Sequence, residues 1–245
     1  MDLELEDDIC ERLGRLPADL KEAYDDIYSK IQNSKGSKPV IAARAFQWIM
    51  CSAVPLRADA LVAVVCQDPE DDKTQQPPRM MSIDFVLDAC RNLVVSDRRT
   101  NVCRLSHLSA REYFKENHWS IDHANVTLAK VCLLLLNDLT NWGQGGCGPL
   151  CFYKNDQLGK IIDYAVRHWY IHVRNREDAD RITNARLSAL LEEFIGDADN
   201  SAPAFKNWYD EYRRVPRDLE EDTDLPISLD DLDRDSPLLF VCVAG

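Results

Sequence analysis

The sequence lacks a phosphate-binding loop, the element with which P-loop ATPases hold a nucleotide. Such a loop requires the pattern Gly-x-x-x-x-Gly-Lys-Ser/Thr, in which backbone amides and a lysine surround the phosphates. The chain has only 9 glycines among its 245 residues, and its one Gly-Lys pair, at residues 159–160, is followed by Ile161 in an apolar segment. We therefore expect this chain neither to bind ATP tightly by itself nor to hydrolyse it.

Other catalytic patterns are missing as well. The sequence contains no nucleophile elbow, and no Ser-His-Asp set or closely spaced pair of carboxylates stands out. Its acidic runs, residues 68–72 and 220–224, have the composition of solvated surface segments. We therefore expect a protein that is not an enzyme.

The sequence also lacks the patterns of secretion and membrane insertion. The residues Met1-Asp2-Leu3-Glu4 are acidic, unlike the basic start of a signal peptide. The apolar run at residues 131–136 is far shorter than the roughly 20 residues that cross a bilayer. The 9 cysteines are odd in number and scattered, as in a chain of reduced and mostly buried thiols. These features predict a cytoplasmic protein without membrane contact.

What is present is the pattern of a helical globular protein. Hydrophobic residues make up 45% of the chain and charged residues 29%, which is enough for a real core. Apolar residues recur at helical spacing in four segments, residues 13–31, 40–51, 56–66 and 82–93. Ser82 is the expected N-cap of the last of these. β-Rich runs at residues 93–95 and 102–106 flank a polar turn and predict a hairpin.

Beyond residue 117 the sequence predicts only helices, at residues 125–139, 158–173, 184–195 and 204–212. The predicted fold class is therefore mainly α: a winged helix, made of three helices and a β-hairpin, followed by an all-α helical spacer. Phe46 and Trp48 are expected in or beside the core of the winged helix.

A histidine stands at the end of the second predicted strand. His107 follows the strand directly, and Ser109 is the expected N-cap of the next helix, with Glu112 completing a capping box. A strand end of this kind can present the imidazole to a neighbouring domain. The alternative is an imidazole whose hydrogen bonds go to the local backbone.

Four segments, residues 16–28, 45–56, 90–113 and 162–172, carry a resemblance to a known family. The last contains Tyr164-Ala165 and then His168-Trp169. In their order and spacing, the segments resemble the exit helix, winged helix and helical spacer of fungal NACHT proteins, which are NOD-like receptors of the STAND class. The winged helix is similar to that of GPI inositol-deacylase-like proteins. Residues 236–245 are similar to the first helix of an ankyrin repeat.

The resemblance implies four regions. They are an exit helix from an absent NACHT domain in residues 1–35, the winged helix in 36–118, the helical spacer in 119–214, and an acidic linker with the start of an ankyrin-like repeat in 215–245.

The resemblance also implies a non-catalytic regulatory middle segment of a signalling protein. A NACHT ATPase domain would precede it and ankyrin repeats would follow it, so its partners would be these domains in cis and other proteins. The upstream domain would bind ATP or ADP in the full-length protein, and this segment would need no cofactor of its own. His107 would face the phosphates of that nucleotide and sense its state.

A zinc site is one alternative that the residues leave open. Cys147 and Cys151 form a C-x3-C pair, and His168 and His172 form an H-x3-H pair on one helix. These residue types at these spacings are those of zinc ligands. The chain would then be a zinc-stabilised protein-interaction module.

A DNA-binding winged helix is the second, less favoured alternative. Affinity for nucleic acid comes largely from clustered Lys and Arg, whereas this chain has a net charge of −13. The helix that would enter the major groove carries Asp84 and Asp88 against Arg91. Only Arg98 and Arg99 stand at the predicted hairpin turn. We therefore expect no nucleic-acid partner.

Overall fold

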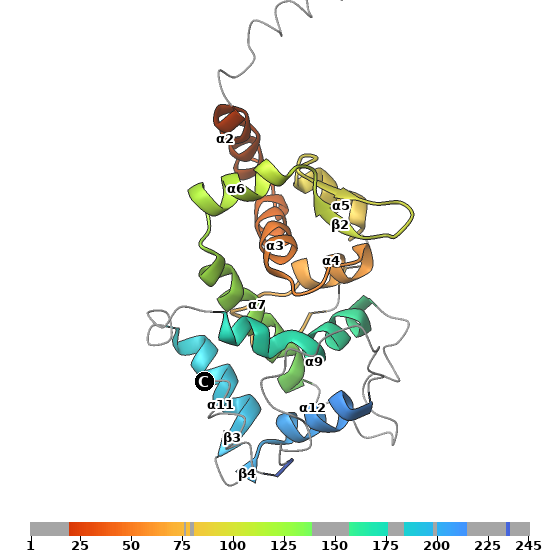
Figure 1. Cartoon of the computed structure of the whole chain (residues 1–245), viewed down its shortest axis with the longest axis vertical. Helices are drawn as coiled ribbons and strands as arrows, with labels where there is room; N and C mark the ends of the chain where they lie inside the picture. Colours follow the sequence, from red (N-terminus) through yellow and green to blue (C-terminus); the bar gives the residue numbers. More distant parts are fainter. Residues whose placement is uncertain are drawn as a thin grey trace, which may run out of the picture.

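The structure, a computed structural model, describes residues 20–75, 77–78, 81–138, 157–175, 184–197, 200–214 and 234–235. Within these ranges it consists mainly of α-helices with two short β-hairpins, so the predicted mainly α class is confirmed (Figure 1). None of the described helices is long and apolar enough to cross a membrane. Cys147, Cys151, the repeat-like residues 236–245 and most of the acidic linker lie outside the described residues.

In residues 20–117 the helices pack around α3. The elements of this part are α2 (Leu20–Gln32), α3 (Lys38–Cys51), α4 (Ala58–Val65), α5 (Ile83–Ala89), β1 (Val94–Ser96), β2 (Cys103–Leu105) and α6 (Leu108–Asn117). α3 contacts α2, α4, α5 and β2. Phe46 and Trp48, both on α3, are fully buried, which confirms their predicted place in the core.

The hairpin is closed by a side-chain-supported turn rather than by a glycine turn. β1 and β2 are antiparallel, with Val94 opposite Leu105 and Ser96 opposite Cys103. The Asp97 carboxylate accepts hydrogen bonds from the backbone N–H groups of Arg99 and Thr100, at 2.8 and 3.0 Å. These bonds stabilise the turn without the Asn-Gly or Asp-Gly pair that is usual in short hairpins.

The segment before α4 pairs with the free edge of β2. Arg57 forms an antiparallel bridge with Val102, and the Cys103 N–H donates to the Leu56 carbonyl at 2.8 Å. β2 therefore lies between β1 and the extended residues that lead into α4. Arg57 therefore lies on the outer strand-like segment, opposite Val102, whereas Arg104 lies on β2 two residues after Val102.

Two predictions about helix ends are wrong. The helix expected at residues 82–93 ends at Ala89, because Arg91 and Asn92 adopt φ values of 50° and 63° that turn the chain into β1. Its start is confirmed, since the Ser82 hydroxyl accepts from the Phe85 N–H. α6 begins at Leu108, so His107 and not Ser109 is the N-cap, and no capping bond from a side chain forms there.

The second half of the described chain consists of four helices and a short hairpin. They are α7 (Ile121–Asp138), α9 (Gln157–Arg174), α11 (Ala185–Ile195), β3 (Gly196–Asp197), β4 (Asn200–Ser201) and α12 (Pro203–Arg214). The hairpin departs from the predicted all-α spacer. It forms because Gly196 ends α11 at a φ of 81°, which glycine adopts without strain, and the chain then reverses at once.

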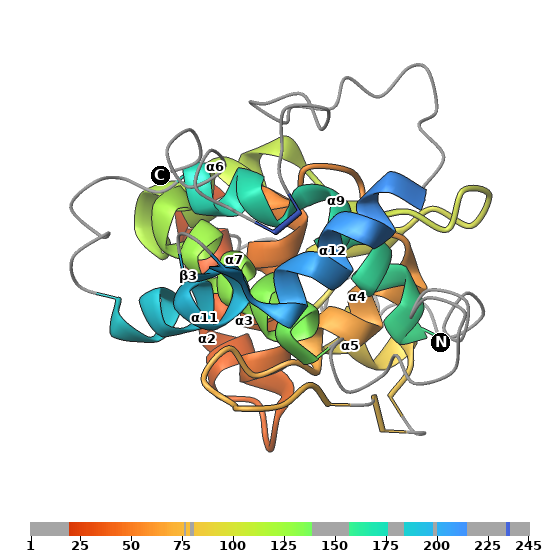
Figure 2. The same cartoon turned by 90° about the horizontal axis from the view of Figure 1, so that it is seen from below.

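The two halves share one hydrophobic core. α7 packs against both α3 and α9, and α9 packs against α4 (Figure 1). α11 and α12 cover the far side of α7, as the view from below shows (Figure 2). The division between winged helix and spacer at residues 118 and 119 therefore stays a prediction, with continuous packing across it.

The described cysteines fit the expectation of mostly buried thiols. Cys90, Cys103 and Cys132 are buried, Cys51 and Cys66 are half-buried, and all five are free thiols. Burial raises the pKa of Cys51 to about 11. Since the thiolate is the reactive form, this burial makes Cys51 a poor nucleophile at neutral pH.

Candidate functional site

His107 lies where β2 ends and α6 begins. It is the N-cap of α6 and has an extended backbone, with φ of −142° and ψ of 149°. Its side chain is exposed and has no hydrogen-bond partner among the described residues. The structure thus places the predicted sensor histidine at the surface, where its ring nitrogens can meet another molecule or domain.

His107 is one of the residues that line a groove of about 530 Å³. Its walls come from the end of α3, the segment before α4, β2 and the first turn of α6. Apolar side chains that include Ile49, Leu105 and Leu108 line it, and Leu108 is 73% exposed. The charged side chains that line it are Arg104 and Arg111, and no Asp or Glu from the described residues does so.

The two arginines keep donors available in this groove. Arg104 forms no ion pair within the described part of the chain, and Arg111 uses one donor on the Met50 carbonyl at 3.1 Å. Elsewhere, cations such as Arg44 and Lys130 meet carboxylates at 2.8 and 2.6 Å. Together with the N-terminus of α6, which favours negative charge, the arginines give the groove the chemistry of an anion site.

α2 is joined to α6 by a set of polar side-chain contacts, here called the junction, that the sequence did not predict. The Tyr113 hydroxyl donates to Asp25 at 2.7 Å, and the His118 Nε2 donates to the Tyr113 oxygen at 2.7 Å. The Ser109 hydroxyl, expected as a cap, instead hydrogen-bonds the Tyr24 hydroxyl at 2.8 Å. The sequence gives no signal for these contacts. The Tyr113–Asp25 and Ser109–Tyr24 pairs each join residues more than 80 positions apart, and the His118–Tyr113 contact forms only when α2 and α6 pack together.

The junction has its own electrostatics. The hydrogen bond from Lys21, followed by that from Tyr113, lowers the pKa of Asp25. Burial lowers the pKa of His118, whose ring centroid lies 3.8 Å from that of Tyr28. Asp25 therefore stays ionised and His118 mostly neutral at neutral pH. The junction holds one anion that accepts from both a lysine and a tyrosine.

Tyr164 and His172 of α9 belong to a buried chain of hydrogen bonds. The Asn125 amide nitrogen donates to the Ile121 carbonyl, so its oxygen accepts from His172 Nδ1–H at 2.9 Å. His172 Nε2 then accepts from the Tyr164 hydroxyl at 2.7 Å, whose oxygen accepts from the Ala53 N–H at 3.0 Å. Every bond has a defined direction, and the chain joins α7 and α9 to the turn after α3.

Burial makes His172 a neutral histidine. Its side chain is fully buried, and burial, aided by repulsion from His168, lowers its pKa to about 3. Trp48 packs over this chain, with ring centroids 5.5 Å from Tyr164 and 6.3 Å from His172. This chain of hydrogen bonds therefore has a structural role, because it fixes the Nδ1–H tautomer of His172 and stabilises the packing of α7, α9 and the turn after α3.

We expect the buried state of His172 to make the protein acid-sensitive. The unfolded chain takes up a proton near pH 6.5, whereas the folded chain does not until about pH 3, so stability falls as pH drops below 6.5. Between pH 8 and pH 5 this histidine alone should remove about 2 kcal/mol of unfolding free energy. Urea titrations across this pH range measure the slope.

His172→Gln removes the titrating group, and His123→Gln, at an exposed position of α7, is the matched control. The pH slope should shrink in the first variant and persist in the second. An identical slope in His172→Gln and the unaltered protein would show that the acid sensitivity comes from other groups.

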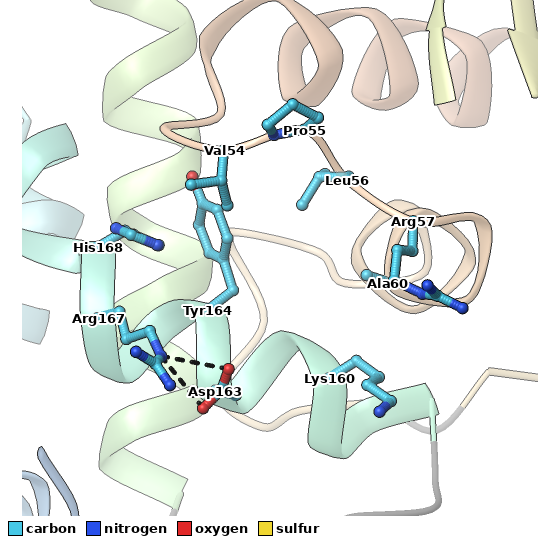
Figure 3. A pocket seen from close by; sticks show the side chains of 10 residues that line it. All are labelled: Val54, Pro55, Leu56, Arg57, Ala60, Lys160, Asp163, Tyr164, Arg167 and His168. Atoms are coloured by element: carbon cyan, nitrogen blue, oxygen red, sulfur yellow. Dashed lines mark hydrogen bonds and ion pairs between the residues drawn. The ribbon is translucent and has the colours of Figure 1, made fainter. Parts of the chain in front are cut away.

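The hydrogen bonds of His172 oppose its predicted role as a zinc ligand. Both ring nitrogens of His172 are engaged in hydrogen bonds, so metal binding would have to break one of them. His168 lies one turn after Tyr164 on α9 and lines a separate pocket between α9 and the residues before α4 (Figure 3). No group of three or more potential metal ligands occurs among the described residues, and Cys147 and Cys151 lie outside them. The four-residue zinc site stays a prediction.

The acidic residues of α5 also oppose the DNA-binding alternative. Asp84 and Asp88 lie on α5, and Asp88 forms an ion pair of 2.5 Å with Lys38. This bond from Lys38 lowers the pKa of Asp88. Arg98 and Arg99 are exposed at the hairpin turn. α5 thus presents carboxylates where a recognition helix needs donors to bases and phosphates.

No protein-family model, curated protein or solved structure gives a significant match to this chain. The resemblance to NACHT proteins therefore rests on the four sequence segments alone.

Proposed function

We propose that this chain is a non-catalytic regulatory segment of a NOD-like signalling protein. It would couple the nucleotide state of an upstream NACHT ATPase domain to downstream ankyrin repeats. The observation that carries the proposal is the groove around His107, which has two arginines with available donors and no carboxylate among its described lining residues. In a chain of net charge −13, such a groove is suited to an anion that another domain holds.

The arrangement of elements supports assigning residues 36–118 to a winged helix. α3, α4 and α5 precede the β1–β2 hairpin, and the residues before α4 pair with the outer edge of β2. This pairing fixes the hairpin against the helices and brings His107 next to the turn after α3. α7 and α9, assigned to the helical spacer, then pack on α3 and α4.

The groove also suggests how coupling would work. His107, Arg104 and Arg111 can donate hydrogen bonds to phosphate oxygens, and charge-assisted bonds of this kind are strong. His107 is the N-cap of α6, which is hydrogen-bonded to α2 through Tyr113 and Asp25. A bound diphosphate would therefore stabilise one position of α6 and, with it, of the exit helix. Losing the contact would shift the population toward another arrangement.

Inorganic pyrophosphate tests the groove in the chain itself. We expect a dissociation constant of about 1 mM, worth roughly 4 kcal/mol, with NMR shifts at the His107 ring and at the Arg104 and Arg111 side chains. Replacing both arginines by Gln should weaken binding strongly, whereas Arg174→Gln at the exposed end of α9 should not. Pyrophosphate that shifts no groove resonance, or that binds equally to the double variant, would contradict the proposal.

A further inference from the structure

A second pocket, of about 300 Å³, lies between the segment leading into α4 and the side of α9 (Figure 3). One wall is mostly apolar and consists of Val54, Pro55, Leu56 and Ala60, with Arg57 at its edge. The other wall belongs to α9 and carries Lys160, Asp163, Arg167 and His168, while the Tyr164 ring reaches toward Val54.

The pocket has an excess of positive charge. Asp163 is the single acidic residue among those that line it, and Arg167 already pairs with it at 3.4 Å. Lys160 has no ion pair among the described residues, and the nearest carboxylate to Arg57 is Asp59, at a long 3.7 Å. Two cations from opposite walls, one on α9 and one beside α4, are thus available to an anion.

The apolar wall indicates what kind of anion fits. A free phosphate would use the cations and leave Val54 and Pro55 in water. A peptide that carries a carboxylate next to an apolar side chain would use both walls, as interfaces combine apolar contact with charge complementarity. Tyr164 is held by the Ala53 N–H and by His172, so this side of the pocket is preformed and ordering it costs little on binding.

We propose that the pocket between α4 and α9 binds an acidic segment of a partner protein. A carboxylate lies between Arg57 and Lys160, and the neighbouring apolar side chain packs against Val54 and Pro55. This site is separate from the anion groove at His107, although Pro55 and Leu56 line both. The proposal does not require the nucleotide role of His107.

Fluorescence polarisation with a labelled peptide of alternating Glu and Leu tests the proposal on the whole chain. The double variant Arg57→Glu/Lys160→Glu should weaken binding about 10-fold or more, because two attractive contacts become repulsive. The control Lys35→Glu/Lys115→Glu changes the net charge equally at exposed sites away from the pocket and should leave binding nearly unchanged. Circular dichroism checks that the variants fold, which is expected since both pocket residues are exposed.

Two further probes separate the possible ligands. A peptide with Ser in place of each Glu should bind about 10-fold more weakly or worse, since it lacks the charges. Val54→Asp, which places a charge in the apolar wall, should also weaken binding of the acidic peptide. Equal binding to the pocket double variant, or tighter binding of an oligonucleotide or of inorganic triphosphate than of the acidic peptide, would overturn the proposal.

Discussion

Phe46→Ala is expected to lower the unfolding free energy of the chain by about 3–5 kcal/mol. The Phe46 side chain is fully buried, with its ring centroid 4.3 Å from Phe114 and 5.9 Å from Trp119. Truncation removes both aromatic contacts and leaves a cavity between α3 and α6. The effect should appear in urea or guanidinium unfolding as a lower midpoint with an unchanged slope.

Phe85→Ala is the matched control for this prediction. Phe85 is only half-buried on α5, where Lys38 lies over its ring, so the same substitution should cost clearly less. A loss below about 1 kcal/mol for Phe46→Ala would mean that Phe46 lies at the surface. Such a result would also contradict the packing of Phe46 on Phe114, which joins α3 to α6.

Helical periodicity predicted most of this fold, because apolar spacing reports directly which side of a helix is buried. Helices at residues 40–51 and 158–173 match α3 and α9 within a few residues. Local chemistry also predicted the Ser82 cap. It failed at Ser109, whose hydroxyl has a partner in α2, and at Arg91 and Asn92, whose left-handed backbone has no clear local signal.

Of the residues that line the groove, the sequence singled out only His107 as a candidate site residue. The position of His107 between a strand and a helix is visible in the sequence. The basic groove is not, because Arg104 and Arg111 meet the end of α3 and residues before α4 that lie some 50 positions earlier. The roles of Tyr164 and His172 were likewise hidden, since Asn125 and Ala53, which complete their hydrogen-bonded chain, come from other elements.

His107→Leu is expected to leave the fold nearly unchanged and to alter the response to nucleotide. The exposed ring makes no hydrogen bond within the described residues, so its loss removes no hydrogen bond from this part of the fold. One hydrogen bond to a charged phosphate contributes about 1.5–3 kcal/mol. Losing it only from the inactive state should shift a closed–open equilibrium about 10- to 150-fold toward the open state.

The dissociation rate of a fluorescent ADP analogue tests the central claim most directly. It is measured on the longer protein that the proposal requires, with an ATPase domain upstream of this chain. His107→Leu should release ADP about 10- to 150-fold faster, while the exposed control His123→Leu should release it at the unaltered rate. An unchanged rate in a folded His107→Leu protein, or the absence of a phosphate-binding loop upstream, would contradict the account.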